Sequence, residues 1–251
     1  MFLPEFTISV VPSHITCLLS DELISIRKGQ DCMVETVPIA RSPIAPAPPL
    51  TVVAGWEISA RHTSAPLRLV DCTSCRKTLI RANTGSATAH LLGVGRGRAR
   101  RDDSGRLVAN PVHEEWLLIG STGLSLPSHL TANADGGPEL VTVEDVTHAR
   151  ALIRIVGTDS AKVMSKLCAI DFGDRASPDN TAMRTSMAGL VVEIVRSDLA
   201  DRSHDAADPV ATLRSYLVLC ERSAGQYLFD ILLDAGQEFG IDVEGFGIGG
   251  L

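Results

Sequence analysis

Alternation of apolar and polar side chains predicts several strands in this chain. In residues 151–156, Leu152, Arg154 and Val156 fall on one face of an extended backbone, and the three residues between them fall on the other. Residues 78–82 have the same character. Further strands are predicted at 105–109, 115–120, 181–187, 190–196 and 215–221.

Helical patterns follow two of these strands and recur near the C-terminus. Residues 86–92 and 160–167 are predicted helices, with Asp159 as the N-cap of the second. In residues 223–240, Ser223 and Gln226 have the spacing of a capping box, and Gly240 stands where a C-terminal stop is expected.

The last predicted helix has an apolar and an acidic face. The apolar stripe has helical period and comprises Tyr227, Leu228, Ile231, Leu232 and Ala235. Asp230, Asp234 and Glu238 recur every four residues on another face. Such a row of carboxylates could hold a metal or act in acid/base chemistry, but a solvated helix face is the better interpretation.

A sequence repeat connects the two halves of the chain. Residues 67–92 are echoed by residues 143–167, with Asp71 matching Asp145 and Thr73 matching Thr147. In the same alignment Arg76 matches Arg150, the pair Ser86-Ala87 matches Ser160-Ala161, and the run 116–119 later resembles 216–219. Because repeats of this kind usually encode two packed copies of one supersecondary unit, we expect an α+β fold of two ferredoxin-like β-α-β units with mostly antiparallel sheets.

Composition narrows the class of protein. The 251 residues are 45% apolar and 21% charged, which is enough to bury a sizeable core. A net charge of −7 argues against general nucleic-acid binding, and no apolar run is long enough to span a membrane. The N-terminus lacks the basic segment of a signal peptide, and six cysteines are too sparse for a disulfide scaffold. We therefore expect a cytoplasmic protein with reduced thiols.

Proline content suggests a boundary between an N-terminal segment and the body. Five prolines crowd residues 38–50, which predicts an extended linker. Residues 1–37 match neither half of the repeat and are expected to be an accessory arm or partly disordered. Residues 51–251 form the predicted compact body, with a polar, acidic surface loop at 197–212.

The pair Cys72 and Cys75 is the most suggestive local motif. A CxxC can bind zinc or exchange disulfides, but zinc needs a second ligand pair, and Cys168 and Cys220 are isolated. A redox motif would stand at a helix N-terminus, whereas this one leads into a strand. Two packed thiols are therefore predicted.

Other candidate sites also lack the residues that their chemistry requires. Residues 93–101 hold three alternating glycines and four arginines, but they follow a helix instead of opening one, so we expect a flexible basic turn that could lie at a subunit contact. His113 has no second histidine in a zincin pattern, and His148 is expected to be a hydrogen-bonded turn residue. No nucleophile, base and orienting group assemble, so the sequence predicts no catalytic or metal site, and it identifies no cofactor-binding residues.

Several segments in order resemble the gamma subunit of heterotetrameric sarcosine oxidase. The matching segments are 40–45, 114–118 and 223–240. That subunit belongs to the folate-binding aminomethyltransferase group, which includes the glycine-cleavage T-protein. The DLSH-like turn of the group is similar to residues 145–148, and its strand and helix entry are similar to 152–161. The resemblance implies a duplicated folate-binding-domain-like fold.

The departures from the group concern its chemistry. T-proteins carry a GGI-x-DD-like stretch whose aspartate supports attack on the aminomethyl group. Here the stretch 188–193 has Val192 at one acidic position and Glu193 at the other. Valine can neither accept a proton nor stabilise a cation. The KGCYxGQE-like signature of tRNA-modifying relatives and the further C-terminal barrel of the T-protein are not matched.

The resemblance implies an accessory, non-catalytic gamma subunit of a complex that oxidatively demethylates sarcosine or a related N-methyl amino acid. Alpha, beta and delta subunits would be its partners, and FAD, FMN, NAD and tetrahydrofolate would be bound by those subunits, with no cofactor on this chain. Two alternatives stay open: a standalone tetrahydrofolate-dependent aminomethyltransferase-like protein, and a scaffold for another amine dehydrogenase, such as an N-methylglutamate-type complex. Glu193 discriminates between the accessory subunit and the standalone enzyme, because an open pocket around it would favour the standalone enzyme.

Overall fold

The computed structural model describes residues 38–120, 140–200 and 212–246, together with the backbone of three strands nearer the N-terminus. The chain divides into two units, Met1–Pro38 and Ile39–Leu251. In the first unit β1 (Val10–Val11), β2 (His14–Leu19) and β3 (Glu22–Arg27) form an antiparallel sheet in that order. The expectation for residues 1–37 otherwise falls outside the described residues.

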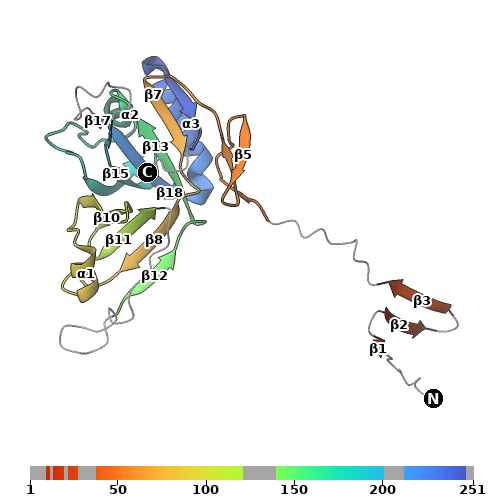
Figure 1. Cartoon of the computed structure of the whole chain (residues 1–251). Coiled ribbons are helices and arrows are strands. Elements are labelled where there is room, and N and C mark those ends of the chain that lie inside the picture. Colours follow the sequence, from red (N-terminus) through yellow and green to blue (C-terminus); the bar gives the residue numbers. More distant parts are fainter. Residues whose placement is uncertain are drawn as a thin grey trace. The chain divides into compact units, whose positions relative to one another are not determined.

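Two large sheets make up the second unit (Figure 1). The five-stranded sheet has the order β12 (Thr142–Asp145), β8 (Arg76–Arg81), β11 (Glu115–Gly120), β10 (Leu107–Val112) and β9 (Arg98–Arg101). The six-stranded sheet has the order β14 (Ala182–Met187), β15 (Leu190–Arg196), β18 (Ser215–Glu221), β13 (Arg150–Val156), β7 (Leu67–Asp71) and β19 (Ile241–Glu244). Neighbouring strands are antiparallel throughout, except for the parallel pair β7 and β19.

The two sheets share one strand order, and they exchange their first strands. Strand β8 is followed around its sheet by β11, β10 and β9, as β13 is followed by β18, β15 and β14. Strand β7 precedes β8 in the chain but pairs with β13, and β12 precedes β13 but pairs with β8. Each half of the sequence repeat therefore completes the sheet of the other half.

Hydrogen bonds at the two Asp-x-Thr turns are reciprocal. The Thr73 hydroxyl accepts from the backbone N–H of Leu152 at 3.1 Å, and the Thr147 hydroxyl accepts from that of Lys77 at 3.0 Å. The backbone N–H of Cys72 donates to the Leu152 carbonyl, as that of Val146 does to the Lys77 carbonyl. Lys77 and Leu152 are thus equivalent, so the second turn is one residue longer than the sequence match of Arg76 with Arg150 implied.

The ferredoxin-like form of the predicted repeat is not confirmed. In a β-α-β unit the helix joins two parallel strands of one sheet. Here α1 (Ala87–Leu92) joins β8 to β9, which lie three places apart in the sheet, and successive antiparallel pairings make them antiparallel to each other. The mostly antiparallel α+β arrangement itself is present.

Three apolar layers hold the sheets and helices together (Figure 1). Helices α2 (Ser160–Leu167) and α3 (Gly225–Gly236) cover the outer face of the six-stranded sheet, where residues such as Ile153 and Val218 are fully buried. Helix α1 covers the outer face of the five-stranded sheet through Leu92. A third cluster, which includes Leu117 and Leu152, fills the space between the two sheets. This inner layer contains the buried polar groups considered below.

Helix ends match the sequence in part. The Ser86 hydroxyl caps α1 by accepting from the Ala89 N–H at 3.0 Å. Asp159 is the residue before α2, but its carboxylate pairs with Lys162 instead of capping the helix. Gly240 ends the C-terminal helical segment in the left-handed region, with φ of 68°. The predicted capping box is wrong, because a 3₁₀ turn, Arg222–Ala224, precedes α3 and carries no side-chain cap.

The apolar stripe of α3 is largely core, and its carboxylates are solvated. Leu228, Leu232 and Ala235 are buried, while Tyr227 is 50% exposed. The predicted acidic face is confirmed as a solvated surface, since Asp230, Asp234 and Glu238 are all exposed.

The proline-rich segment is packed on the body, which differs from the predicted linker. Strand β4 (Ala40–Arg41) pairs with β6 (Trp56–Ser59), which also pairs with β5 (Leu50–Val53). Ile44 is only 1% exposed and belongs to the main core. Proline density excludes helix, as predicted, but it does not prevent a segment from packing when an apolar side chain between the prolines can be buried.

Candidate functional site

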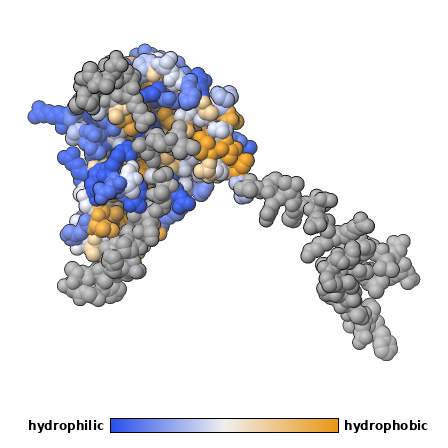
Figure 2. All heavy atoms as spheres, viewed as in Figure 1, coloured by the Kyte–Doolittle hydropathy of each residue, from blue (hydrophilic) through white to orange (hydrophobic). Residues whose placement is uncertain are grey.

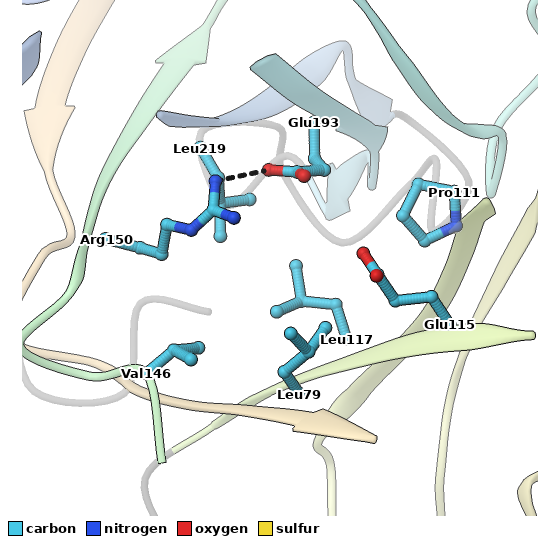
Figure 3. Close-up of a pocket in the computed structure, with 8 residues that line it drawn as sticks. All are labelled: Leu79, Pro111, Glu115, Leu117, Val146, Arg150, Glu193 and Leu219. Carbon is cyan, nitrogen blue, oxygen red and sulfur yellow. Dashed lines mark hydrogen bonds and ion pairs between the residues drawn. The ribbon is translucent and has the colours of Figure 1, made fainter. Parts of the chain in front are cut away.

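A pocket opens between the two sheets beside Glu193, the acidic residue discussed in the sequence analysis. Glu193 and Leu219 come from the six-stranded sheet, and Glu115 and Leu117 come from the five-stranded sheet. Figure 3 shows the eight lining residues, which also include Leu79, Pro111, Val146 and Arg150.

Alternation along β15 directs Glu193 into this pocket. Val192 and Ile194 are fully buried against the helices on the outer face, so Glu193 and Val195 face the other sheet. The Glu193 residue is 5% exposed. Val192, which replaces an acidic residue of the family pattern, therefore points away from the pocket.

Two arginines engage both oxygens of the Glu193 carboxylate. Arg184, across the hairpin on β14, donates from Nε to Oε1 at 2.8 Å, and its Nη2 lies 2.6 Å from the same oxygen. Arg150 donates from Nη1 to Oε2 at 3.4 Å, the contact drawn in Figure 3. A buried carboxylate whose two oxygens are both engaged by arginines is fixed in orientation and has no free oxygen to accept a substrate proton, so it is a poor general base.

The same arginines extend the contacts into a chain of ion pairs. Arg150 also pairs with the exposed Glu221 at 3.2 Å, and Arg184 also pairs with Glu115. Glu115 in turn pairs with Arg81 at 3.2 Å. The chain of charges therefore connects β15 of one sheet to β11 and β8 of the other, and its geometry is that of a link between sheets.

The pocket does not fit the folate that the fold family implies. Its space, including open solvent at the mouth, is about 270 Å³, below the roughly 300–1,000 Å³ of ligand pockets. Its walls are aliphatic apart from the paired charges, and no aromatic ring lines it. The charged side chains among the eight lining residues are all engaged in ion pairs, so none is free to recognise a pteridine. The pocket is therefore assigned no role in folate chemistry.

The CxxC pair lies in the inner layer between the sheets, where its two thiols are packed. Cys72 and Cys75 are both free and buried. Burial raises the pKa of the Cys72 thiol strongly, and it raises the pKa of Cys75 to about 11. Because the thiolate is the nucleophile and the metal ligand, both thiols are unreactive near neutral pH.

Lys77 lies beside the thiols with no exposed surface. Its ammonium donates to the carbonyls of Thr73 at 2.7 Å and Cys75 at 2.9 Å. Burial lowers the pKa of Lys77 to about 8. Sequence alternation gave no reason to expect this residue inside the fold, because Lys is seldom buried without a carboxylate partner.

The remaining sequence candidates lie apart from one another. The basic run 93–101 is not simply a flexible turn, because Gly93 caps α1 and Arg98–Arg101 form β9. The exposed His148 ring stacks on Trp56, with centroids 4.8 Å apart and planes 8° apart. His113 contacts Glu114 on the surface at 3.7 Å. Within the described ranges, no group of three His, Cys, Asp or Glu residues could hold a metal.

A second pocket of about 310 Å³ lies under the proline-rich segment. Two acidic side chains, Asp71 and Glu244, line this second pocket. Burial raises the pKa of Asp71. The Asp71 carboxylate accepts from the Thr73 N–H at 2.9 Å, which holds the first Asp-x-Thr turn. The role of Asp71 is therefore to shape the turn.

Comparisons with known proteins agree with this fold. No family model and no curated protein matches the chain. A chain of the heterotetrameric sarcosine oxidase from Corynebacterium sp. U-96, solved in complex with pyrrole 2-carboxylate, is similar with a TM-score of 0.54 and 25% identity. The match covers 72% of this chain and 89% of that one.

Glycine cleavage system aminomethyltransferase T from Bartonella henselae is also similar, with a TM-score of 0.54 and 12% identity. The match covers 78% of this chain and 55% of that one, so the chain spans about half of the aminomethyltransferase. These neighbours confirm the T-protein-like fold inferred from the sequence. In the described part of the chain, no helix is long and apolar enough to cross a membrane.

Proposed function

We propose that this chain is an accessory gamma-type subunit of a flavin-dependent, heterotetrameric sarcosine oxidase-like complex. The observation that carries the proposal is the similarity to a sarcosine oxidase chain over 89% of that chain's length. The complex would oxidatively demethylate sarcosine or a related N-methyl amino acid. Alpha, beta and delta subunits would bind FAD, FMN, NAD and tetrahydrofolate.

The state of Glu193 supports an assembly role over a catalytic one. Its carboxylate is paired with Arg150 and Arg184, and the pocket beside it is small and aliphatic. General-base catalysis requires a carboxylate oxygen that is free to reach the substrate proton, and here both oxygens are engaged by arginines. The four described cysteines are free thiols, which agrees with a protein that functions in the reducing cytoplasm.

An exposed apolar patch offers a surface for a partner subunit. Figure 2 shows apolar atoms gathered over the β5 hairpin, where Leu50 and Val52 are each about half exposed (50% and 52%). The apolar stripe of α3 is a poorer candidate for an interface, because Leu228 and Leu232 are fully buried in the core. Permanent interfaces are richer in apolar residues than ordinary surface, so β5 is the better candidate.

Co-purification of the tagged chain from its native host, followed by mass spectrometry, tests the proposal. We expect flavin-containing and large NAD-binding subunits to be recovered with it. The Val52→Lys variant should keep the wild-type Tm, because the side chain is exposed, and should recover less of the partners. Recovery of the wild-type chain alone as a stable monomer would overturn the proposal.

The alternative is a standalone tetrahydrofolate-dependent aminomethyltransferase-like protein, and Glu193 is the observation in its favour because it lines a pocket. Titration of the isolated chain with tetrahydrofolate distinguishes the two. We expect no tight binding, whereas micromolar or tighter binding that is lost in Glu193→Gln would establish the alternative.

A further inference from the structure

Arg154 is a buried arginine that the proposed function does not use. It lies on β13, between Val70 of β7 and Leu217 of β18, and the residue is 1% exposed. Alternation along β13 directs its side chain, like that of Leu152, into the layer between the two sheets. Arginine is almost never fully buried unless it is paired.

Most of the Arg154 guanidinium has no hydrogen-bond partner. Nη1 donates to the Ser215 hydroxyl at 3.3 Å. Nε and Nη2 are buried and have no acceptor among the described residues. An unsatisfied buried charge is one of the most costly features a fold can contain. Nε and Nη2 therefore indicate a hydrogen-bond acceptor beside Arg154 that the described residues do not supply.

The two unpartnered atoms share one edge of the planar guanidinium. Nε and Nη2 point their N–H groups in parallel, which is the fork that binds two oxygens of one carboxylate, phosphate or sulfate. A single neutral acceptor could satisfy only part of this edge. The geometry therefore selects a ligand with two adjacent anionic oxygens.

The surroundings of Arg154 add positive charge, and the carboxylate near Arg101, that of Asp179, is exposed and already accepts from the Asn180 amide and the Asp198 N–H. Arg101 of β9 lies near enough that the Arg154 charge, after burial, contributes to lowering the pKa of Arg101. Arg101 donates to the Ser197 hydroxyl at 3.1 Å, and the Ser197 N–H donates to the Ser215 carbonyl. In the described ranges neither Arg101 nor Arg154 forms an ion pair with a carboxylate.

Nearby acidic groups cannot act as the missing anion. The thiols of Cys72 and Cys75 stay neutral because burial raises their pKa values. The carboxylate of Asp71 is occupied by its own turn. The local cluster of Arg154, Arg101 and Lys77 is thus an excess of cations inside the fold.

We propose that Arg154, assisted by Arg101 and the hydroxyl of Ser215, binds one small oxyanion between the two sheets. The ligand class is an anion with two adjacent oxygens, either tetrahedral, as in inorganic phosphate or sulfate, or planar, as in acetate. The anion neutralises the cations of the inner layer and so stabilises the contact between the sheets. This site is independent of the proposed function.

The test uses the full chain, purified and dialysed into chloride buffer, then titrated with phosphate, sulfate or acetate at constant ionic strength. We expect one anion per chain by equilibrium dialysis and a rise in Tm of several degrees. Acid-denatured protein is analysed by ion chromatography, so that an anion retained through purification is also counted. The anion that binds with a stoichiometry of one per chain identifies the ligand as tetrahedral or planar.

Two arginine variants make the result specific. Arg154→Met should bind no anion, and its Tm should show only the general salt effect. Arg196→Met is the matched control, because Arg196 is also buried but is paired with Asp174 and Asp198. It should lower the Tm and still bind the anion.

If Arg154→Met fails to fold, Arg154→Lys provides the second measurement, because it keeps the charge but lacks the fork. We expect at least tenfold weaker anion binding by this variant. The proposal is overturned if wild-type chain contains and binds none of the three anions, or if Arg154→Lys binds as tightly as wild type.

Discussion

Glu193 is the residue at which the sequence and the structure give the most direct information about chemistry. The side chain survives where the family pattern expects acid, yet it is paired with two arginines in a small pocket. In this position the carboxylate contributes to a chain of ion pairs between the two sheets.

Substitution of Glu193 by Gln should destabilise the chain by roughly 2–4 kcal/mol, since it leaves Arg150 and Arg184 facing a neutral group in a buried site. Urea denaturation measures the free energy of unfolding. Glu144→Gln is the control, because Glu144 ends the same chain of ion pairs with its side chain 52% exposed, and it should cost less than ~0.5 kcal/mol. Equal effects of the two substitutions would contradict the buried-link interpretation.

Lys77 gives a pH dependence whose sign follows from its burial. Its pKa is lowered from 10.5 to about 8 in the fold, so between these pH values the unfolded chain binds more protons than the folded chain. The contribution of Lys77 to stability therefore rises as pH increases from 8 to 10.5 and is lowest below pH 8.

Comparison with Lys77→Met isolates this effect from other titrating groups. The free energy of unfolding of Lys77→Met minus that of wild type should fall by about 2–3 kcal/mol between pH 8 and pH 10.5. Chemical denaturation at several pH values checks it. A difference that stays constant with pH would show that Lys77 is charged in the fold as it is in water.

At the residue scale, part of the site could have been predicted. Arg184 and Glu193 are a cross-strand pair around the tight turn at Ala188 and Gly189, which have φ of 49° and 81°. An Ala-Gly turn with both φ values positive sets that register, so the pairing follows from the hairpin alone. Arg150 lies 43 residues from Glu193 and joins it only through the sheet, so no local pattern reveals it.

At the scale of elements, the two Asp-x-Thr turns are the joints between the sheets. Each threonine hydroxyl accepts from a buried backbone N–H at the start of a strand in the other half of the repeat. The turns therefore add two hydrogen bonds to those that the exchanged strands make between the halves.

Thr73→Ala and Thr147→Ala should each cost roughly 1–3 kcal/mol, because each leaves a buried N–H without an acceptor. Thr→Ser at either position keeps the hydroxyl and should recover most of the loss. Thermal denaturation of the four variants tests this. If the serine variants were as unstable as the alanine variants, the lost methyl group would be responsible and the hydrogen bond would not matter.

Element prediction succeeded for several strands that have a buried face, although the buried strand β7 was missed. The predicted strands 115–120, 190–196 and 215–221 coincide with β11, β15 and β18, which lie inside their sheets. Strand β12 has all four residues exposed and was missed, because a solvated edge strand shows no alternation. The exchange of β7 and β12 could not be predicted, since a sequence repeat records similar segments and not their pairing partners.

For the whole molecule, the sequence resemblance gave the fold that the structural neighbours confirm, but the domain boundary lies elsewhere. The second unit begins at Ile39, so the proline-rich segment belongs to the body. Polyproline character describes the backbone of that segment and carries no information on Ile44, whose burial depends on a core formed by distant residues.

Two truncations test the boundary. Removal of residues 1–38 should change the Tm of the body by less than ~2 °C, because the second unit has its own cores. Removal of residues 1–50 also deletes β4 and Ile44, and should lower the Tm by at least ~5 °C. Equal Tm values for the two truncated chains would restore the linker interpretation of residues 38–50.

The exchange of first strands also affects the order of events during synthesis on the ribosome. When residue 120 has emerged, β8, β11, β10 and β9 are available, but β12 is still to be made and β7 has no partner. Neither sheet can be completed until the second half of the repeat is translated, which makes folding depend on distant pairings. The nascent first half therefore leaves the tunnel with unpaired strand edges, which favour aggregation until the second half is made.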